Sequence, residues 1–194
     1  MKIIIFILTI YTFIFSDDSI EKVIERYNDG SVRLEKFFKD GNKYGKWIKY
    51  YKNGNILEEI NYENGKINGH WTWYYQNGNK WKIENYKQNV INGKWVSYYE
   101  KGQIKQEGNY KESKKDNKLI EYYENGKIKK EENYKDGWYV GKWTSYYKNE
   151  QIEYEENWED GIKYGKWIYY YKNGQIKSEQ YYKDGELLET KLSP

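Results

Sequence analysis

The chain has 194 residues, with 33 basic and 30 acidic side chains and a formal net charge of +3. Lysine and glutamate are mixed throughout, which excludes the strongly basic stripe typical of nucleic-acid binders. Aromatic residues make up 20% of the chain, including 25 Tyr and 9 Trp. Disordered segments lack aromatic residues, so we expect a single folded domain with Tyr and Trp as its core material. Because the chain has no Cys, disulfides and thiolate metal sites are excluded.

The N-terminus has the composition of a secretory signal. Met1 and Lys2 precede an apolar run over 3–15, and Ser16 is followed by Asp17. A basic start, an apolar stretch and a small residue before a polar one predict a signal peptide over 1–16, followed by a short linker over 17–20. The run is shorter than the roughly 20 residues that span a bilayer. A buried first strand and a retained membrane anchor are the alternatives, and cleavage implies an exported protein (periplasmic, cell-surface or secreted).

A 24-residue unit then repeats seven times over residues 21–188 and leaves a tail over 189–194. The clearest copies begin at Gly45 and Gly165 and read Gly-Lys-Trp-Ile-x-Tyr-Tyr-Lys-Asn-Gly. Internal periodicity of this length is the signature of a repeat architecture. The units begin at Glu21, Gly45, Gly69, Gly93, Asn117, Gly141 and Gly165.

Each unit contains two strand-like runs separated by turn signals. The first run is Gly-Lys-Trp-x-x-Tyr-Tyr and leads into Asn-Gly, as at Asn53–Gly54; the second ends in an aromatic residue before Asp-Gly, as at Asp160–Gly161. Asn-Gly and Asp-Gly predict two-residue hairpin loops in which both residues take positive φ. Two short turns leave no room for a crossover helix, so we expect an all-β, elongated, single-layer antiparallel meander of repeated hairpins.

Two-residue loops predict a register that places the glutamate of one unit opposite the second-place lysine of the next. Opposite charges that face each other across strands stabilise a sheet and fix its register. The predicted pairs are Glu35–Lys46, Glu107–Lys118, Glu131–Lys142 and Glu155–Lys166.

The pattern Gly-Lys-Trp-x-x-Tyr-Tyr-x-Asn-Gly-x-Ile, followed by Glu-x-Asn-Tyr-x-Asp-Gly, resembles the MORN variant repeat. This unit occurs in bacterial proteins often grouped as YwqK-family antitoxin components. The resemblance covers nearly all of the chain from Glu21 to Leu188 and implies a twisted antiparallel sheet. Some positions depart from the pattern and put the local turn geometry in question: Asn117, Leu119, Glu150 and the turn Glu112–Ser113.

The recurring tryptophans predict a structural row within the fold. They occupy the third place of five units, and Leu119 stands in the equivalent place of another. This substitution indicates that the place needs an apolar body rather than an indole N–H. The row comprises Trp47, Trp71, Trp95, Trp143 and Trp167.

The sequence offers little catalytic chemistry. His70 is the single histidine and stands where other units carry Lys. One His and no Cys exclude zinc sites of the usual kind and His-based triads. Paired glutamates such as Glu58–Glu59 recur with the unit, whereas an active site should break the periodicity. We therefore expect a non-enzymatic protein without a cofactor or a metal.

Four aromatic residues do break the periodicity and are the candidate ligand contacts. They occupy columns where sister units carry Lys, Ser, Glu or Gln, and such columns are expected to face solvent. Exposed aromatic side chains in excess are a sign of binding. The alternative is that they shield a sheet that has no second layer. The four are Trp73, Trp81, Tyr154 and Tyr169.

Three functions remain open from the sequence. A protein-interaction scaffold fits a stacked repeat, because its contacts add up along a surface without a single pocket. A cell-wall or carbohydrate-binding module fits rows of Trp and Tyr on an exported sheet. An antitoxin that acts on a protein partner is implied by the resemblance but conflicts with export. We expect no nucleic-acid partner, and membrane contact only through an uncleaved signal segment.

Overall fold

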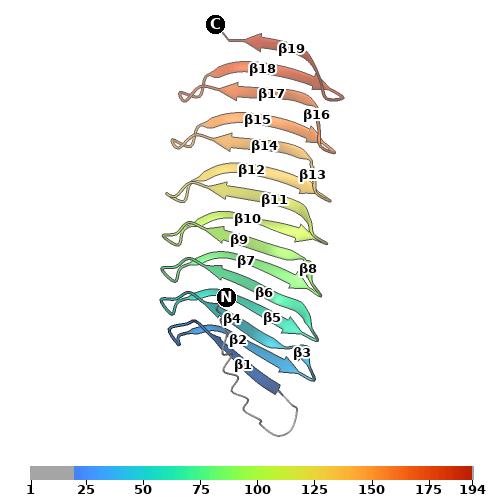
Figure 1. Ribbon diagram of the computed structural model, residues 1–194. Helices are drawn as coiled ribbons and strands as arrows, with labels where there is room; N and C mark the ends of the chain where they lie inside the picture. Colours follow the sequence, from blue (N-terminus) through green and yellow to red (C-terminus); the bar gives the residue numbers. More distant parts are fainter. Residues whose placement is uncertain (1–19, 194) are drawn as a thin grey trace, which may run out of the picture. The chain divides into compact units, whose positions relative to one another are not determined.

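The computed structural model describes residues 20–193, which form strands and turns without a helix (Figure 1). Every strand pairing in this range is antiparallel, as predicted. The chain in this range therefore holds no helix that could cross a membrane. The predicted signal peptide over 1–16 lies outside the described residues.

The chain divides into two compact units, 1–90 and 91–194. In the first unit, the strands of the described residues 20–90 form an open sheet of hairpins, and these residues place no second layer over either face (Figure 1). Its strands are β1 (Ile20–Arg26), β2 (Val32–Lys39), β3 (Asn42–Lys43), β4 (Gly45–Tyr50), β5 (Ile56–Glu63), β6 (Lys66–Tyr74) and β7 (Lys80–Lys87). The short β8 (Val90–Ile91) lies at the division in the sequence.

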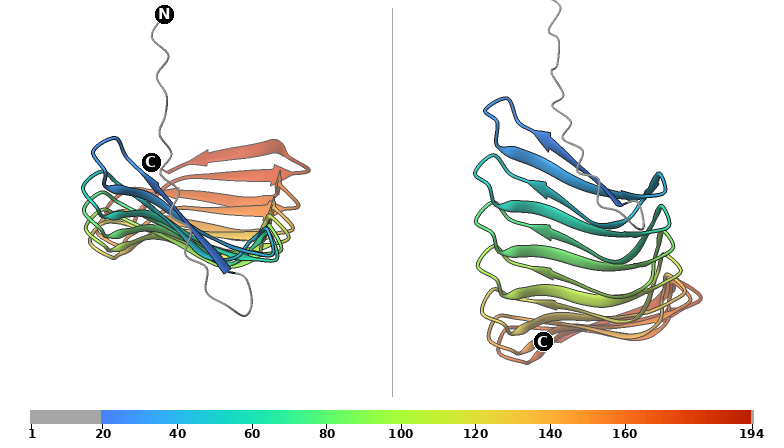
Figure 2. Two further views of the ribbon diagram at one scale, coloured as in Figure 1. Left: turned by 60° about the horizontal axis from the view of Figure 1, so that its bottom comes forward. Right: turned by 90° about the horizontal axis from the view of Figure 1, so that it is seen from below.

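The second unit repeats the same arrangement of hairpins. Its first strands are β9 (Gly93–Tyr98), β10 (Ile104–Lys111), β11 (Lys114–Tyr122), β12 (Ile128–Lys135), β13 (Trp138–Tyr139) and β14 (Gly141–Tyr146). They continue with β15 (Ile152–Glu159), β16 (Ile162–Lys163), β17 (Gly165–Tyr170), β18 (Ile176–Lys183) and β19 (Glu186–Leu192). In each unit the Asn-Gly loops lie at one end of the strands, and the Asp-Gly turns lie at the other end (Figure 2).

The Asp-Gly turns have the predicted two-residue geometry. Lys39 pairs with Asn42, and between them Asp40 and Gly41 have φ angles of 51° and 74°. Positive φ at both central residues defines the turn type that matches the twist of a hairpin. The turn at Glu112–Ser113 keeps this geometry with φ angles of 48° and 66°, although neither residue is glycine.

The Asn-Gly loops differ from the prediction because they contain three residues. Tyr51 N–H donates to the Asn55 carbonyl over 2.8 Å, which closes a loop of Lys52, Asn53 and Gly54. Only Gly54 has a positive φ, at 86°. The Asn53 side chain instead accepts a hydrogen bond from Asn55 N–H at 3.1 Å. The asparagine thus stabilises the turn through its side-chain oxygen, and the glycine alone supplies the left-handed residue.

The predicted lysine–glutamate register between units is wrong by two residues. Glu35 lies opposite Ile48, not Lys46. Pairing beside the Asp40–Gly41 turn follows the prediction, but Tyr44 and Gly45 then form a bulge, with Gly45 at a φ of 64°. The two extra residues move the following strand along its partner. Every other predicted pair is displaced in the same way, as Glu107–Ile120, Glu131–Thr144 and Glu155–Ile168 show.

The core is thin and aromatic. In the second unit Trp95, Leu119, Tyr134 and Trp143 form one buried cluster, against which Tyr110 and Trp158 pack. Trp95 and Leu119 are each only 6% exposed. Leucine therefore fills the tryptophan place as an apolar body, as the sequence indicated.

Candidate functional site

One face of each unit carries an ordered array of lysine, glutamate and tyrosine, which we call the ladder face. The glutamate pairs with the second-place lysine of its own hairpin, as in Lys94–Glu107 at 2.7 Å. It also accepts a hydrogen bond from a tyrosine of the next hairpin, as Tyr122 donates to Glu107 over 2.8 Å. Burial and this bond raise the pKa of Tyr122 to about 12. The ion pairs are Lys22–Glu35, Lys46–Glu59, Lys94–Glu107, Lys118–Glu131, Lys142–Glu155 and Lys166–Glu179.

In the 24-residue repeat that contains His70, both the lysine and the glutamate of the ladder are replaced. His70 occupies the lysine place, and Ile83 occupies the glutamate place of the same hairpin. Loss of the cation therefore coincides with loss of the anion that would need it. This paired change supports a structural role for the ladder, because an unpartnered charge would weaken the sheet.

The opposite face of each unit carries the tryptophans, and we call it the tryptophan face. The tryptophans do not stack directly on one another but alternate with the aromatic residue that ends the second strand of each hairpin. Trp47 lies 4.8 Å from Tyr62, and Trp167 lies 5.0 Å from Trp158 and 4.9 Å from Tyr182 between ring centroids. Such contacts add to the area that the rings bury.

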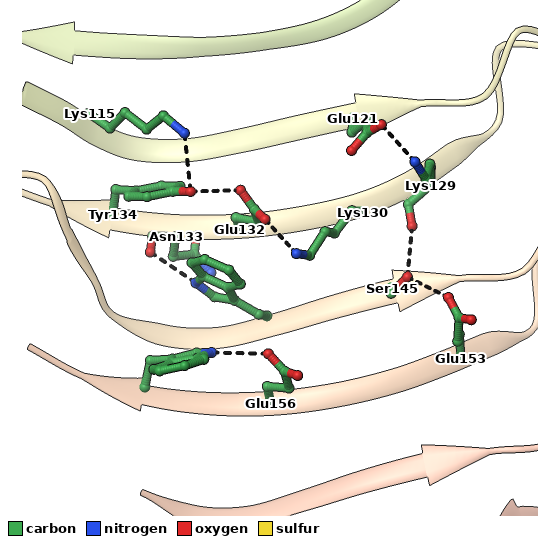
Figure 3. A network of polar contacts seen from close by, with 12 residues as sticks. Lys115, Glu121, Lys129, Lys130, Glu132, Asn133, Tyr134, Ser145, Glu153 and Glu156 are labelled. Carbon is green, nitrogen blue, oxygen red and sulfur yellow. Dashed lines mark hydrogen bonds and ion pairs between the residues drawn. The ribbon is translucent and has the colours of Figure 1, made fainter. Parts of the chain in front are cut away.

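Lysine side chains cover several of these rings. The Lys163 ammonium lies 4.4 Å from the Trp167 ring centroid, and Lys43 lies 4.9 Å from Trp47. Lys130 lies 4.9 Å from Trp143 and pairs with Glu132 at 2.7 Å (Figure 3). These cation–π contacts occupy ring faces that a ligand would otherwise contact. The recurring tryptophans are therefore mainly structural.

A polar network runs across the tryptophan face of the second unit (Figure 3). Tyr134 donates a hydrogen bond to Glu132 over 2.8 Å, and Trp158 donates through its indole N–H to Glu156 over 3.2 Å. Burial among aromatic side chains raises the pKa of Glu156 above its usual range. Because each carboxylate has a donor from its own strand, the network holds the aromatic rings in place.

Trp73, a predicted contact residue, packs within the fold of the first unit. Its ring stacks on Trp71 at 4.6 Å with an angle of 18° between the planes. Glu58 and Lys82 are its direct cross-strand neighbours. The half-buried Trp73 is thus stacked on Trp71, and the Lys82 ammonium lies 5.8 Å from its ring centroid, so its ring is not a free platform.

Tyr154 and Tyr169 lie opposite each other on paired strands of the second unit, with ring centroids 6.1 Å apart. Both are half-buried, and burial raises the pKa of Tyr169 to about 12. The sequence suggested that their columns face solvent. The structure shows that some members of these columns are buried. Ser145, from the column of Tyr169, is only 4% exposed because Glu153 lies over it and accepts its hydroxyl hydrogen bond at 2.9 Å.

Trp81 is the most exposed of the four candidates, at 47%, and its ring lies 6.3 Å from Tyr75. The structure adds an exposed aromatic residue that sequence reasoning missed. Trp138 is 62% exposed and lies against the backbone of Gly161. Its column carries Asn42, Lys66, Lys114 and Glu186 in other repeats, although Val90 and Ile162 also stand there, so the column comparison gives a signal for Trp138.

The tryptophan face of the first unit contains a hollow of about 260 Å³. Trp47, Tyr62, Leu34 and Ile60 form its apolar surface. Its polar rim comprises Arg33, Lys49 and Glu58.

These features define an open-sheet β-repeat protein with a charged ladder face and an aromatic tryptophan face. Comparison with protein families gives six matches to the MORN repeat variant, and the matched segments cover more than half of the chain. They are residues 43–64, 67–88, 91–112, 115–136, 139–160 and 163–184. The chain therefore belongs to the family of proteins with MORN repeat variants. No curated protein matches it.

Proposed function

We propose that the protein is an exported, non-enzymatic scaffold that binds a protein partner through exposed aromatic side chains on a rigid repeat. The observation that carries this proposal is the exposure of Trp81 and Trp138. Neither takes part in the alternating aromatic row or the ladder, and most sister repeats carry polar residues in both columns, with Leu57, Val90 and Ile162 as the apolar exceptions. Exposed tryptophans are the side chains most often found to dominate interface energetics.

The arrangement of the glutamates supports a role without catalysis. Adjacent glutamates such as Glu58 and Glu59 point to opposite faces, because side chains alternate along a strand. Glu58 accepts the indole N–H of Trp71 over 3.1 Å, while Glu59 accepts the hydroxyl of Tyr74 over 3.0 Å. These pairs therefore cannot act together on one bond. The antitoxin role that the resemblance implied stays a prediction.

A photo-crosslinking experiment tests the scaffold. A photoreactive phenylalanine analogue replaces Trp81 or Trp138 in the native host, with exposed Lys101 as the control position. We expect one crosslinked protein at the tryptophan positions and none at Lys101. Affinity for that purified partner should fall at least tenfold in Trp81→Lys or Trp138→Lys, with little change in melting temperature. Equal adducts at all three positions, or unchanged affinity, would contradict the scaffold.

Mass spectrometry of the protein purified from the native host tests export. The apolar run over 3–15 leads us to expect a mature chain that begins near Asp17. An intact Met1 on protein from the cytoplasm would exclude export and leave the scaffold to act inside the cell.

A further inference from the structure

Two apolar side chains, Leu34 and Ile60, line the hollow on the first unit at places where most other hairpins carry polar residues. In a later hairpin the place of Leu34 is taken by Lys130, which extends over Trp143. Leu34 is shorter than this lysine. Lys43 and Lys36 lie 4.9 and 5.6 Å from the Trp47 ring centroid, and Trp47 still lines the hollow beside Leu34. Ile60 stands where other hairpins carry Glu84, Glu132 or Glu156 and adds an apolar wall.

The charged groups at the rim are already paired within the chain. Arg33 pairs with Glu25, and Lys49 pairs with Glu58 at 3.6 Å. Glu58 also accepts the indole N–H of Trp71. The hollow therefore offers hydrogen-bond donors and acceptors without an uncompensated charge, which favours an uncharged ligand.

The size of the hollow limits the ligand to a single ring. Pockets for drug-sized molecules have volumes of roughly 300–1,000 Å³, and this hollow lies below that range. Its surface requires a ligand with an apolar side for Trp47 and Ile60 and with polar groups around its edge. A ligand with polar groups can add hydrogen bonds to the rim groups, which a purely apolar side chain from a protein cannot do.

We propose that the hollow beside Trp47 binds one uncharged pyranose ring of a glycan. The C–H face of the ring lies against Leu34, Ile60 and the part of the Trp47 indole that lines the hollow, and its hydroxyl groups bond to Lys49, Arg33 and Glu58. This site is separate from the exposed tryptophans of the scaffold proposal. The two proposals can therefore fail independently.

An NMR titration tests the site. The full chain, labelled with a nitrogen isotope, is titrated with cellotetraose and, separately, with tetra-N-acetylchitotetraose. We expect shifts in the indole N–H signals of Trp47 and Trp71, with the indole signals of Trp143 and Trp167 unchanged. At roughly 0.3 kcal/mol per non-hydrogen atom, one ring gives half-saturation at about 1 mM or weaker. No shift with either sugar at concentrations on the order of 20 mM would overturn the proposal.

Leu34→Lys fills the hollow as Lys130 does in its own hairpin, and we expect at least tenfold weaker sugar binding. Gln106→Lys makes the same change at the equivalent place beside Leu119 and should leave binding unchanged. Ile60→Glu provides a second test if Leu34→Lys does not fold. Sugar binding that persists in a folded Leu34→Lys variant would overturn the proposal. The full chain is also titrated with p-cresol, which has the structure of a tyrosine side chain. Indole shifts with p-cresol but not with the sugars would also overturn the proposal, because the hollow would then bind an aromatic side chain.

Discussion

The tryptophan column shows how one residue type meets two requirements at a single place. Its ring fills the space between neighbouring hairpins, and in Trp143 and Trp167 the indole N–H donates to a backbone carbonyl at 3.1 and 3.0 Å. The Asn133 carbonyl that Trp143 contacts also accepts Val140 N–H at 3.0 Å. Loss of the indole donor alone therefore leaves that carbonyl bonded, which explains why leucine is acceptable in the column.

We expect Trp95→Ala to lower the free energy of unfolding by about 3–5 kcal/mol, because it leaves a cavity in a buried aromatic cluster. Trp95→Leu should cost much less, since Leu119 fills the same column at the same exposure of 6%. Urea denaturation of the two variants measures the difference. Equal losses would contradict the view that the column needs an apolar body.

The ladder makes stability depend on pH through individual carboxylates. A hydrogen bond from Lys94, together with one from Tyr122, lowers the pKa of Glu107 below its ordinary value. A carboxylate with a lowered folded-state pKa contributes stability above its unfolded pKa and loses it as the pH falls through the folded value. The ladder therefore weakens in acid.

We expect Glu107→Gln to be less stable than the natural chain at pH 7 and to match it more closely below pH 4.5. Melting temperatures measured by circular dichroism from pH 7 to acid give this comparison. Glu159→Gln, at the exposed end of β15, is the control and should show a smaller difference at pH 7. A Glu107→Gln deficit that stays constant with pH would argue against the ion pair as its cause.

At the scale of elements, the two kinds of turn divide their tasks. The three-residue loops need one left-handed residue, whereas the Asp-Gly turns need two. A non-glycine residue in this conformation costs roughly 1–2 kcal/mol, less for Asp and Asn. The Glu112–Ser113 turn is therefore strained, because both residues have positive φ angles and neither is Gly, Asp or Asn.

We expect Ser113→Gly to raise the free energy of unfolding by up to about 1 kcal/mol by relieving this strain. Asn53→Gly is the matched control, because Asn53 has no positive φ and uses its side chain to bond Asn55. The control should be neutral or destabilising. Stabilisation of similar size in both variants would show that turn strain is not the cause.

The interrupted ladder in the hairpin of β6 and β7 gives a test of pairing between strands. His70→Lys with Ile83→Glu restores the cation and the anion found in the other hairpins. A double-mutant cycle should show a favourable coupling of about 0.2–1 kcal/mol, reduced by high salt. Zero coupling would mean that register is fixed by the turns and bulges without the ladder.

At the scale of the whole molecule, each hairpin contacts its neighbours within its compact unit, so the stability of each unit adds up from repeats and their interfaces. The Asp-Gly turn, the bulge and the three-residue loop recur once per 24 residues. Removal of a whole repeat therefore preserves every local geometry, whereas removal of half a repeat does not.

Deletion of residues 117–140 should leave a folded protein with a lower melting temperature and a smaller dependence of unfolding on urea, because less surface is buried. Deletion of residues 117–128 should disrupt cooperative unfolding, because it removes one strand of a hairpin and reverses the direction of the next. Circular dichroism and urea titration of both variants test this. A cooperative, native-like half-repeat deletion would contradict the additive view.

The sequence by itself determined the repeat, the antiparallel meander and the places of both turns, since these follow from local turn chemistry and a fixed period. It also identified the tryptophan column, because Leu119 shows what that place requires. The register between hairpins was decided only in the tertiary structure, because the bulge at Tyr44–Gly45 depends on how two strands pair. The exposure of Trp138 and the hollow beside Trp47 likewise depend on neighbouring hairpins, whose side chains decide which surfaces are covered.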